Sequence, residues 1–173
     1  DGHVVLLEKE NDPYTDDPDP YAFVDGDDVR CPESGEVHPS FVELLERLGH
    51  TYADVSVSGS GVHALYVGKL PDGYKQAVFD IDDEPWGAND SPPTVEIYDG
   101  KHVCVVTGQH VPGTPLEINL WDDDALATIL DEHVPTNDRH LTSHDTDRER
   151  SDLRDYEPTA TAGEATAEIR DVF

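Results

Sequence analysis

Residues 55–68 read VSVSGSGVHALYVG, an apolar alternation that stops at two glycines and then resumes. Such alternation is typical of a strand, and glycine accepts the backbone angles of a tight turn. We therefore expect a strand, a turn over Ser58–Gly61 and a second strand. A turn of small residues leaves backbone N–H groups uncovered, and such a nest suits a phosphate. His63 follows closely and can donate a hydrogen bond to that anion; a plain hairpin with a surface histidine is the alternative.

Further strands are predicted on both sides of this stretch. Residues 94–98 alternate, with Val95 and Ile97 on one face and Glu96 on the other. The turn signal Asp99-Gly100 predicts that this strand forms a hairpin with residues 101–107. Short apolar runs predict two more strands, at residues 4–7 and 21–24.

Two helices are expected. The first covers residues 39–49 and has an apolar stripe, a capping box of Ser40 and Glu43, and Gly49 as its stop. The second covers residues 121–132 with Asp122 as its N-cap.

Residues 71–93 are expected to be irregular, with only Val78 and Ile81 as strong candidates for burial. Strands mixed with helices and hairpins predict an α+β fold, a mostly antiparallel sheet with flanking helices. We expect one domain over residues 1–133. From residue 134 the chain is charged and poor in large apolar residues, which is typical of a disordered linker or tail.

The composition is strongly acidic, with 39 acidic and 11 basic residues among 173 and a net charge of −28. An excess of this size indicates a protein that works in molar salt, where the Debye length falls to about 3 Å and self-repulsion is screened. We infer a salt-accumulating, haloarchaeal source; an acidic protein with basic partners is the alternative. The charge does not exclude a nucleic-acid partner, because counterion release contributes little in molar salt.

No signal peptide and no long apolar run is visible, so a cytoplasmic protein with no membrane partner is expected. The chain begins without methionine and ends on a helix-like segment. We therefore expect a fragment of something longer.

Asp25 and Asp27 stand two residues apart at the end of an apolar strand, so their carboxylates point to one side. Oxygen ligands of this kind bind Mg²⁺ or Mn²⁺. Glu96 is the candidate for a third carboxylate, because it sits on a second strand. The alternative is chance, since pairs such as Asp80/Asp82 also occur in so acidic a chain.

In its motif order the chain resembles the archaeo-eukaryotic primase superfamily, above all the primase–polymerase domains (the N-terminal type of bifunctional DNA primase/polymerases) of plasmids, viruses and archaea. An Asp-x-Asp pair is followed by a Ser-Gly-x-Gly-x-His turn, a Glu-Ile-Tyr strand and a Val-Thr-Gly segment. The matching segments are Phe23–Asp27, Ser56–His63, Val95–Tyr98 and Val105–Gly108. The resemblance covers over half of the chain, which is short before the first motif.

This resemblance implies an RRM-like catalytic core that synthesises or extends primers on a single-stranded DNA template. Asp25, Asp27 and Glu96 would hold two Mg²⁺ or Mn²⁺ ions. His63 and the turn would hold the triphosphate of the incoming nucleotide, with Lys101 neutralising a phosphate and Thr107 lining the nucleotide pocket. The turn residues concerned are Ser58, Gly59, Ser60 and Gly61. A helicase domain C-terminal to this chain is a possible partner.

Two other functions stay open. The same three carboxylates fit a metal-dependent nuclease or phosphodiesterase, which would keep a histidine or lysine beside them to handle the attacking water. A nucleic-acid-binding module of the same fold without activity is the third reading.

Overall fold

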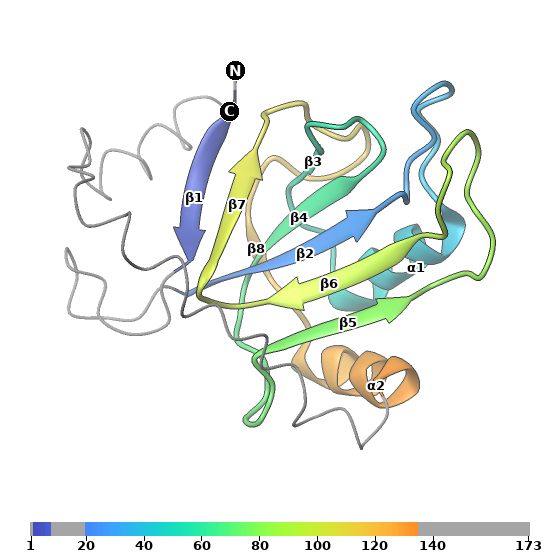
Figure 1. Ribbon diagram of the computed structural model, residues 1–173. Helices are drawn as coiled ribbons and strands as arrows, with labels where there is room; N and C mark the ends of the chain where they lie inside the picture. Colours follow the sequence, from blue (N-terminus) through green and yellow to red (C-terminus); the bar gives the residue numbers. More distant parts are fainter. Residues whose placement is uncertain (1, 8–19, 135–173) are drawn as a thin grey trace, which may run out of the picture.

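A six-stranded sheet forms the centre of the computed structural model, which describes residues 2–7 and 20–134. Five antiparallel strands follow one another, and the short β8 pairs in parallel with β4 (Figure 1). The strands in order are β3 (Ala53–Val55), β4 (Val62–Val67), β2 (Tyr21–Asp27), β6 (Thr94–Tyr98) and β5 (Gln76–Asp80), with β8 (Asn119–Leu120) beside β4. The predicted α+β class with a mostly antiparallel sheet is confirmed. The tail expected from residue 134 lies outside the described residues except for Val134, which is buried.

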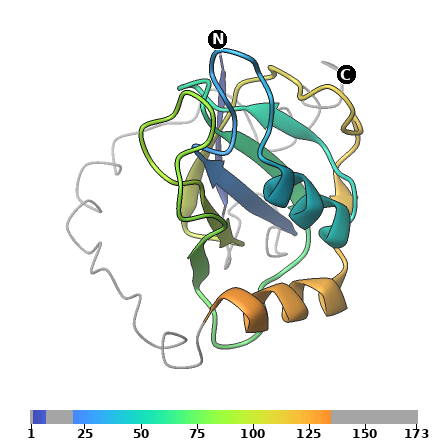
Figure 2. The same cartoon turned by 90° about the vertical axis from the view of Figure 1, so that its right-hand side faces the viewer.

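The two helices, α1 (Pro39–Leu48) and α2 (Asp123–His133), cover one face of the sheet (Figure 2). Both bury an apolar stripe there. The buried helix residues are Phe41, Leu44 and Leu48 from α1 and Leu126, Ile129 and Leu130 from α2. Among the described residues, no helix is long and apolar enough to pass through a bilayer.

Two of the three helix caps that the sequence predicts are confirmed. Asp122 is the N-cap of α2 and accepts a hydrogen bond from the Ala125 N–H at 2.9 Å. Gly49 ends α1 with φ of 98°. The predicted capping box of α1 is wrong: Pro39 takes the first helical position, so the N-cap is His38, whose Nδ1 accepts from the Ser40 N–H.

The predicted hairpin of residues 94–98 with residues 101–107 is also wrong. Strand β7 (His102–Val106) pairs with β1 (His3–Leu7) in a separate two-stranded sheet. The reason is that β6 already has neighbours on both sides, β2 and β5, so no edge is left for β7. The chain therefore leaves the sheet at Lys101, which has φ of 59°.

The stretch over residues 71–93 contains a strand that the sequence did not reveal. In β5, Ala77 and Phe79 point into the core, whereas Val78 is 41% exposed. The expected burial of Val78 is therefore wrong, and Ile81 is only partly buried against the core. A small alanine at one inward position weakened the apolar alternation that marks a strand.

The described residues cover only part of the sheet face away from the helices. Phe23, Leu65 and Tyr98 form a second apolar cluster there with Leu7 and Cys104 from the β1–β7 pair. Next to this cluster, at the end of the sheet where β2 finishes, the same face carries acidic residues. We call this part the open face.

Candidate active site

Four residues on four neighbouring strands form one row across the open face. Asp54 of β3 is paired with His63 of β4, His63 with Asp25 of β2, and Asp25 with Glu96 of β6. Directly paired residues of antiparallel strands carry their side chains on the same face. The tertiary structure thus brings together Asp25, His63 and Glu96, which the sequence proposed, and adds Asp54.

A second row lies next to the first. Asp27 is paired with Thr94, and Thr94 with Asp80 on the edge strand β5. The Thr94 hydroxyl donates to Asp80 Oδ1 at 2.9 Å. Asp27 is exposed, two residues beyond Asp25, and its charge acts on the Asp25 carboxyl. All three predicted carboxylates therefore share one face.

Close packing on the other side of β2 holds this end of the strand in place. Gly26, between the two aspartates, faces α1, where a Cβ atom would come within 2.6 Å of the Phe41 ring and 2.7 Å of Val29. Only glycine fits there, so the spacing of the Asp25 and Asp27 carboxylates depends on the helix-covered core.

The surroundings of Asp25 disfavour the charged form of its carboxyl group. Burial raises its pKa to about 6; His63 opposes the shift, and the charges of Asp27 and Glu96 add to it. Its Oδ1 atom is buried and has no hydrogen-bond partner among the described residues. Apart from His63 Nε2 at 3.5 Å, no cationic group of the described residues contacts this oxygen, which suits a further cation.

His63 lies between two carboxylates. Its Nε2 is 3.5 Å from Asp25 Oδ1 and its Nδ1 is 3.4 Å from Asp54 Oδ1, and its side chain is 9% exposed. Burial lowers the pKa of His63, but hydrogen bonding to Asp54 and the charge of Asp25 outweigh it, so the pKa is raised above 6.5. The ring is thus suited to carrying a positive charge.

Asp54 is the residue that sequence reasoning missed. It is fully buried, and its Oδ2 accepts hydrogen bonds from the N–H of Thr107, the hydroxyl of Thr107 and the N–H of Gly108. The signal was present, because a charged residue stands between Ala53 and Val55 in an otherwise apolar strand. Thr107, predicted to line a nucleotide pocket, contacts Asp54 of this row, and Asp54 and the Val55 carbonyl hold its hydroxyl.

The turn over Ser58–Gly61 connects β3 and β4 as predicted, but its backbone is less open than the nest hypothesis requires. Gly59 N–H donates to the Ser56 carbonyl, Ser60 N–H to Ser58 Oγ, and Gly61 N–H to Ser56 Oγ. The turn satisfies these three N–H groups internally. The hydroxyls of Ser58, which is exposed, and Ser60, which is half-buried, hydrogen-bond to each other at 3.0 Å.

Arg30 is a second residue that sequence reasoning missed. Its Nη1 donates to the Gly59 carbonyl at 2.6 Å and its N–H to the Ser60 carbonyl at 2.7 Å, so it is fixed beside the turn. Within residues 2–7 and 20–134, no carboxylate forms an ion pair with it. A cation without an acidic partner in so acidic a chain marks a place where an anion can bind.

Lys101 does not join this group. It lies in the turn between β6 and β7, beyond Tyr98 and thus at the end of β6 away from Asp27. Its N–H donates to the Leu7 carbonyl, and its side chain is exposed. Arg30, and not Lys101, is the basic residue that lies beside the turn.

The fit of a divalent ion can be tested on these residues. Three carboxylates of one face supply the hard oxygen donors that Mg²⁺ and Mn²⁺ prefer, and Asp25 Oδ1 accepts no hydrogen bond from the described residues. In the part of the chain that the structure describes, however, no three His, Cys, Asp or Glu side chains already surround a common point. The donor set fits the ion, and binding requires side-chain rotation around Asp25.

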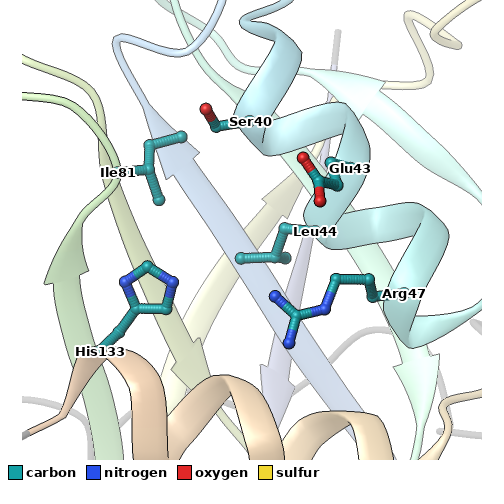
Figure 3. A pocket seen from close by; sticks show the side chains of 6 residues that line it. All are labelled: Ser40, Glu43, Leu44, Arg47, Ile81 and His133. Carbon is teal, nitrogen blue, oxygen red and sulfur yellow. The ribbon is translucent and has the colours of Figure 1, made fainter.

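A hollow in the described part of the chain lies away from these residues. A cavity of about 210 Å³ lies between α1, α2 and the segment after β5 (Figure 3). It is lined by Ser40, Glu43, Leu44, Arg47, Ile81 and His133. Because the helices cover the opposite face of the sheet, this cavity is separate from the Asp25 row.

Comparison with known proteins adds no assignment. No model of a protein family matches the chain, and a search of curated proteins gives no significant match. The functional argument therefore depends on the geometry of the open face.

Proposed function

We propose that this chain is the catalytic core of a primase–polymerase, with an RRM-like sheet, that joins nucleotides on a single-stranded DNA template. The observation that carries the proposal is the strand register. It places Asp25, Glu96 and His63 in one row, with Asp27 beside them and the Ser-Gly-Ser-Gly turn at the same end of the sheet.

The acidic residues account for the chemistry of nucleotidyl transfer. Asp25, Asp27 and Glu96 would hold the divalent ions. Such ions lower the pKa of the attacking hydroxyl and neutralise charge on the leaving pyrophosphate. The protein itself supplies oxygen ligands on a sheet face whose spacing is fixed by the packed core behind it.

We assign the triphosphate to the part of the site next to the carboxylates, where His63 and Arg30 lie. His63 Nε2 points to the Asp25 carboxylate and can donate to a phosphate oxygen. Arg30 adds a guanidinium beside the turn, and Ser58 and Ser60 add hydroxyls. These groups together can bind an anion in a chain that otherwise repels it.

A nuclease is the second candidate. The contact of 3.5 Å between His63 and Asp25 favours it, because hydrolysis needs a group beside the carboxylates to handle water. Arg30 and the serine-rich turn favour the transferase, since a nuclease has no triphosphate to bind.

Primer synthesis and primer extension in molar KCl with Mg²⁺ or Mn²⁺ test the proposal. We expect incorporation by the wild type and none by the double variant Asp25→Ala/Asp27→Ala, which loses two ligands. The matched control is Asp72→Ala/Asp83→Ala, which removes two exposed aspartates outside the site and should incorporate normally.

Two results would count against the proposal. Incorporation by the Asp25→Ala/Asp27→Ala variant at the wild-type rate would reject the carboxylate assignment. Shortening of a labelled DNA strand without nucleotides, lost in the same variant, would support the nuclease instead.

A further inference from the structure

The loop between β5 and β6, residues 81–93, lies against the segment that leaves β2 (Figure 1 and Figure 2). That segment, residues 28–37, follows directly on Asp27 and carries Arg30. It therefore joins the carboxylates of the site to the cation beside the turn. The proposed function gives the loop no role, but its hydrogen bonds indicate which part of the site it holds.

Asn89 of the loop makes two hydrogen bonds to the main chain of this segment. The residue is half-buried, and its Nδ2 donates to the Asp28 carbonyl at 2.7 Å and to the Arg30 carbonyl at 3.1 Å. The NH₂ end of an amide has two protons, and both are used on these carbonyls. Asn89 thus ties together the main chain on both sides of Val29.

The first of these contacts is made at an unusual backbone conformation. Asp28 has φ of 54°, in the left-handed region that residues with a side chain seldom adopt. Such a conformation persists where the surrounding structure imposes it. The bend at Asp28 turns the chain from Asp27, at the end of β2, towards Arg30.

Other contacts fix the position of Asn89 itself. Its N–H donates to the Trp86 carbonyl at 3.1 Å, which closes a tight turn, and Trp86 Nε1 donates to the Glu36 carbonyl at 3.1 Å. In the same turn Gly87 has φ of 61°, and a Cβ atom there would come within 2.6 Å of the Cys31 Cβ. Because the turn packs so closely on the segment after β2, Asn89 is held against its two acceptors.

Arg30 is restrained from two directions. Its N–H and its guanidinium donate to the Ser60 and Gly59 carbonyls of the turn, and its own carbonyl accepts from Asn89. Without Asn89 the contacts with the turn remain, but the main chain between Asp27 and Arg30 loses two hydrogen bonds. The cation would then move with the turn, and its place relative to the carboxylates would no longer be fixed.

We propose that Asn89 is a positioning residue that holds the bend at Asp28 and thereby keeps the Arg30 guanidinium in a fixed place relative to Asp27. A triphosphate that reaches from the ions on the carboxylates to Arg30 binds best when both are already in position. The part that concerns the nucleotide rests on the proposed function. The part that concerns the bend does not, because it follows from the hydrogen bonds of Asn89.

Hydrogen exchange of the Arg30 N–H tests the bend without any substrate. In Asn89→Ala we expect this N–H to exchange about tenfold faster, because two hydrogen bonds that restrain the main chain around it are lost. The Val111 N–H, which donates to the Ala53 carbonyl at 2.9 Å beside the opposite edge strand of the sheet, is the reference and should not change.

Asn119→Ala is the matched control. Asn119 Nδ2 also donates to a main-chain carbonyl, that of His50 at 2.9 Å, but it lies in β8 and does not contact Arg30. Exchange of the Arg30 N–H should stay at the wild-type rate in this variant.

Two exchange results would overturn the proposal. One is an unchanged rate at Arg30 in Asn89→Ala, and the other is an equal rise at Arg30 and Val111, which would indicate a general loss of stability. If Asn89→Ala does not fold, Asn89→Ser takes its place. Serine keeps one donor, so a smaller rise at Arg30 is expected, and no rise would overturn the proposal equally.

A kinetic measurement separates this inference from the proposed function. If the chain is a nucleotidyltransferase, Asn89→Ala should raise KM for the nucleotide by up to about tenfold, the change expected for loss of Arg30 itself, and should change kcat less. In the Arg30→Gln background the same substitution should have no further effect on KM, since it acts through Arg30.

An additive effect on KM in the double variant, or a fall of kcat at unchanged KM, would reject the role of Asn89 in placing Arg30 for the nucleotide. A wild type without incorporation would reject the proposed function, and the exchange result would then decide whether Asn89 holds the bend.

Discussion

The helix-covered face and the open face of the sheet are built by the same strands from different residues. In β2, Ala22 and Val24 are completely buried under the helices, whereas Asp25 and Asp27 point the other way. The first face is closed by α1 and α2. Among the described residues, the second is covered near Phe23 and Tyr98 by the β1–β7 pair, and at Asp54 and His63 by the segment that follows β7.

The difference separates stability from function. The helix-covered face contributes apolar burial, the main source of folding free energy. The open face retains a carboxylate with a buried, unpartnered oxygen and a pKa raised to about 6, which opposes folding. A chain that keeps such a group gains from it in some way other than stability.

The largest effect is expected from a truncation on the helix-covered face. Leu126→Ala removes a side chain that is 1% exposed, so we expect a loss of about 2–5 kcal/mol in the free energy of unfolding. Denaturant unfolding in molar KCl measures it. Activity per folded molecule should be unchanged, since α2 lies away from the Asp25 row.

Leu120→Ala is the control for this truncation. The same atoms are removed from a side chain that is 74% exposed, and the change should stay within about 0.5 kcal/mol. Loss of nucleotide incorporation by folded Leu126→Ala would show that the two faces are not independent.

A substitution on the open face should raise the free energy of unfolding and remove activity, the reverse of what is expected for Leu126→Ala. Asp25→Asn is expected to abolish incorporation and yet to stabilise the metal-free chain. A pKa raised from 3.8 to about 6 means that the folded state binds the proton more tightly. The free energy of unfolding of the wild type therefore falls by up to about 3 kcal/mol as the pH rises from about 4 to 6, and the variant avoids this loss.

Unfolding curves of Asp25→Asn and wild type at pH 4 and pH 8, with a chelator present, check this result. The gain should be present at pH 8 and absent at pH 4. Asp72→Asn, at an exposed position, should show no gain at either pH. A variant less stable than wild type at pH 8 would mean that the ionised carboxylate is stabilising.

The smallest effect is expected from removing a single basic side chain, and it compares Arg30 beside the turn with Arg47 on the helix-covered side. Arg30→Gln should raise KM for the nucleotide about tenfold, equivalent to about 1.4 kcal/mol of lost binding, because the cation beside the turn is removed. Steady-state kinetics measure the change. The free energy of unfolding should fall by no more than the contribution of one hydrogen bond to a charged group, about 1.5–3 kcal/mol.

Arg47→Gln provides the control on the helix-covered side. Arg47 pairs with Glu132 at 2.8 Å, and both side chains are substantially exposed, so the loss of this pair should cost less than about 1 kcal/mol. Its KM should stay at the wild-type value. Equal changes of KM in both variants would point to a general charge effect.

Local features were predictable because the residues that cause them are close in the chain. The strand at residues 94–98, the stripe of α1, the Gly49 stop and the Asp122 cap depend on neighbours within a few positions. Asp25, Asp27, Glu96 and His63 were recognisable from residue type and strand context, and the register places them on one face.

Apart from the α1 cap and the missed strand β5, which depend on adjacent residues, the errors concern contacts between distant segments. His38 is the N-cap of α1 because Pro39 is the first helical residue. Strand β7 pairs with β1 because both edges of β6 are already paired. Asp54 and Arg30 became site residues only through partners far along the chain, Thr107 and Gly59. The residues adjacent to Asp54 and Arg30 in the sequence do not predict those partners.

The sequence by itself determined which segments alternate, which are amphipathic and which side chains can hold a metal ion or a phosphate, because these depend on spacing and residue type. Only the tertiary structure decided which strands are neighbours. With that it decided that one buried aspartate faces the histidine and that an arginine lies beside the turn. Strand pairing is a competition for free hydrogen-bonding edges, and its outcome depends on the whole sheet.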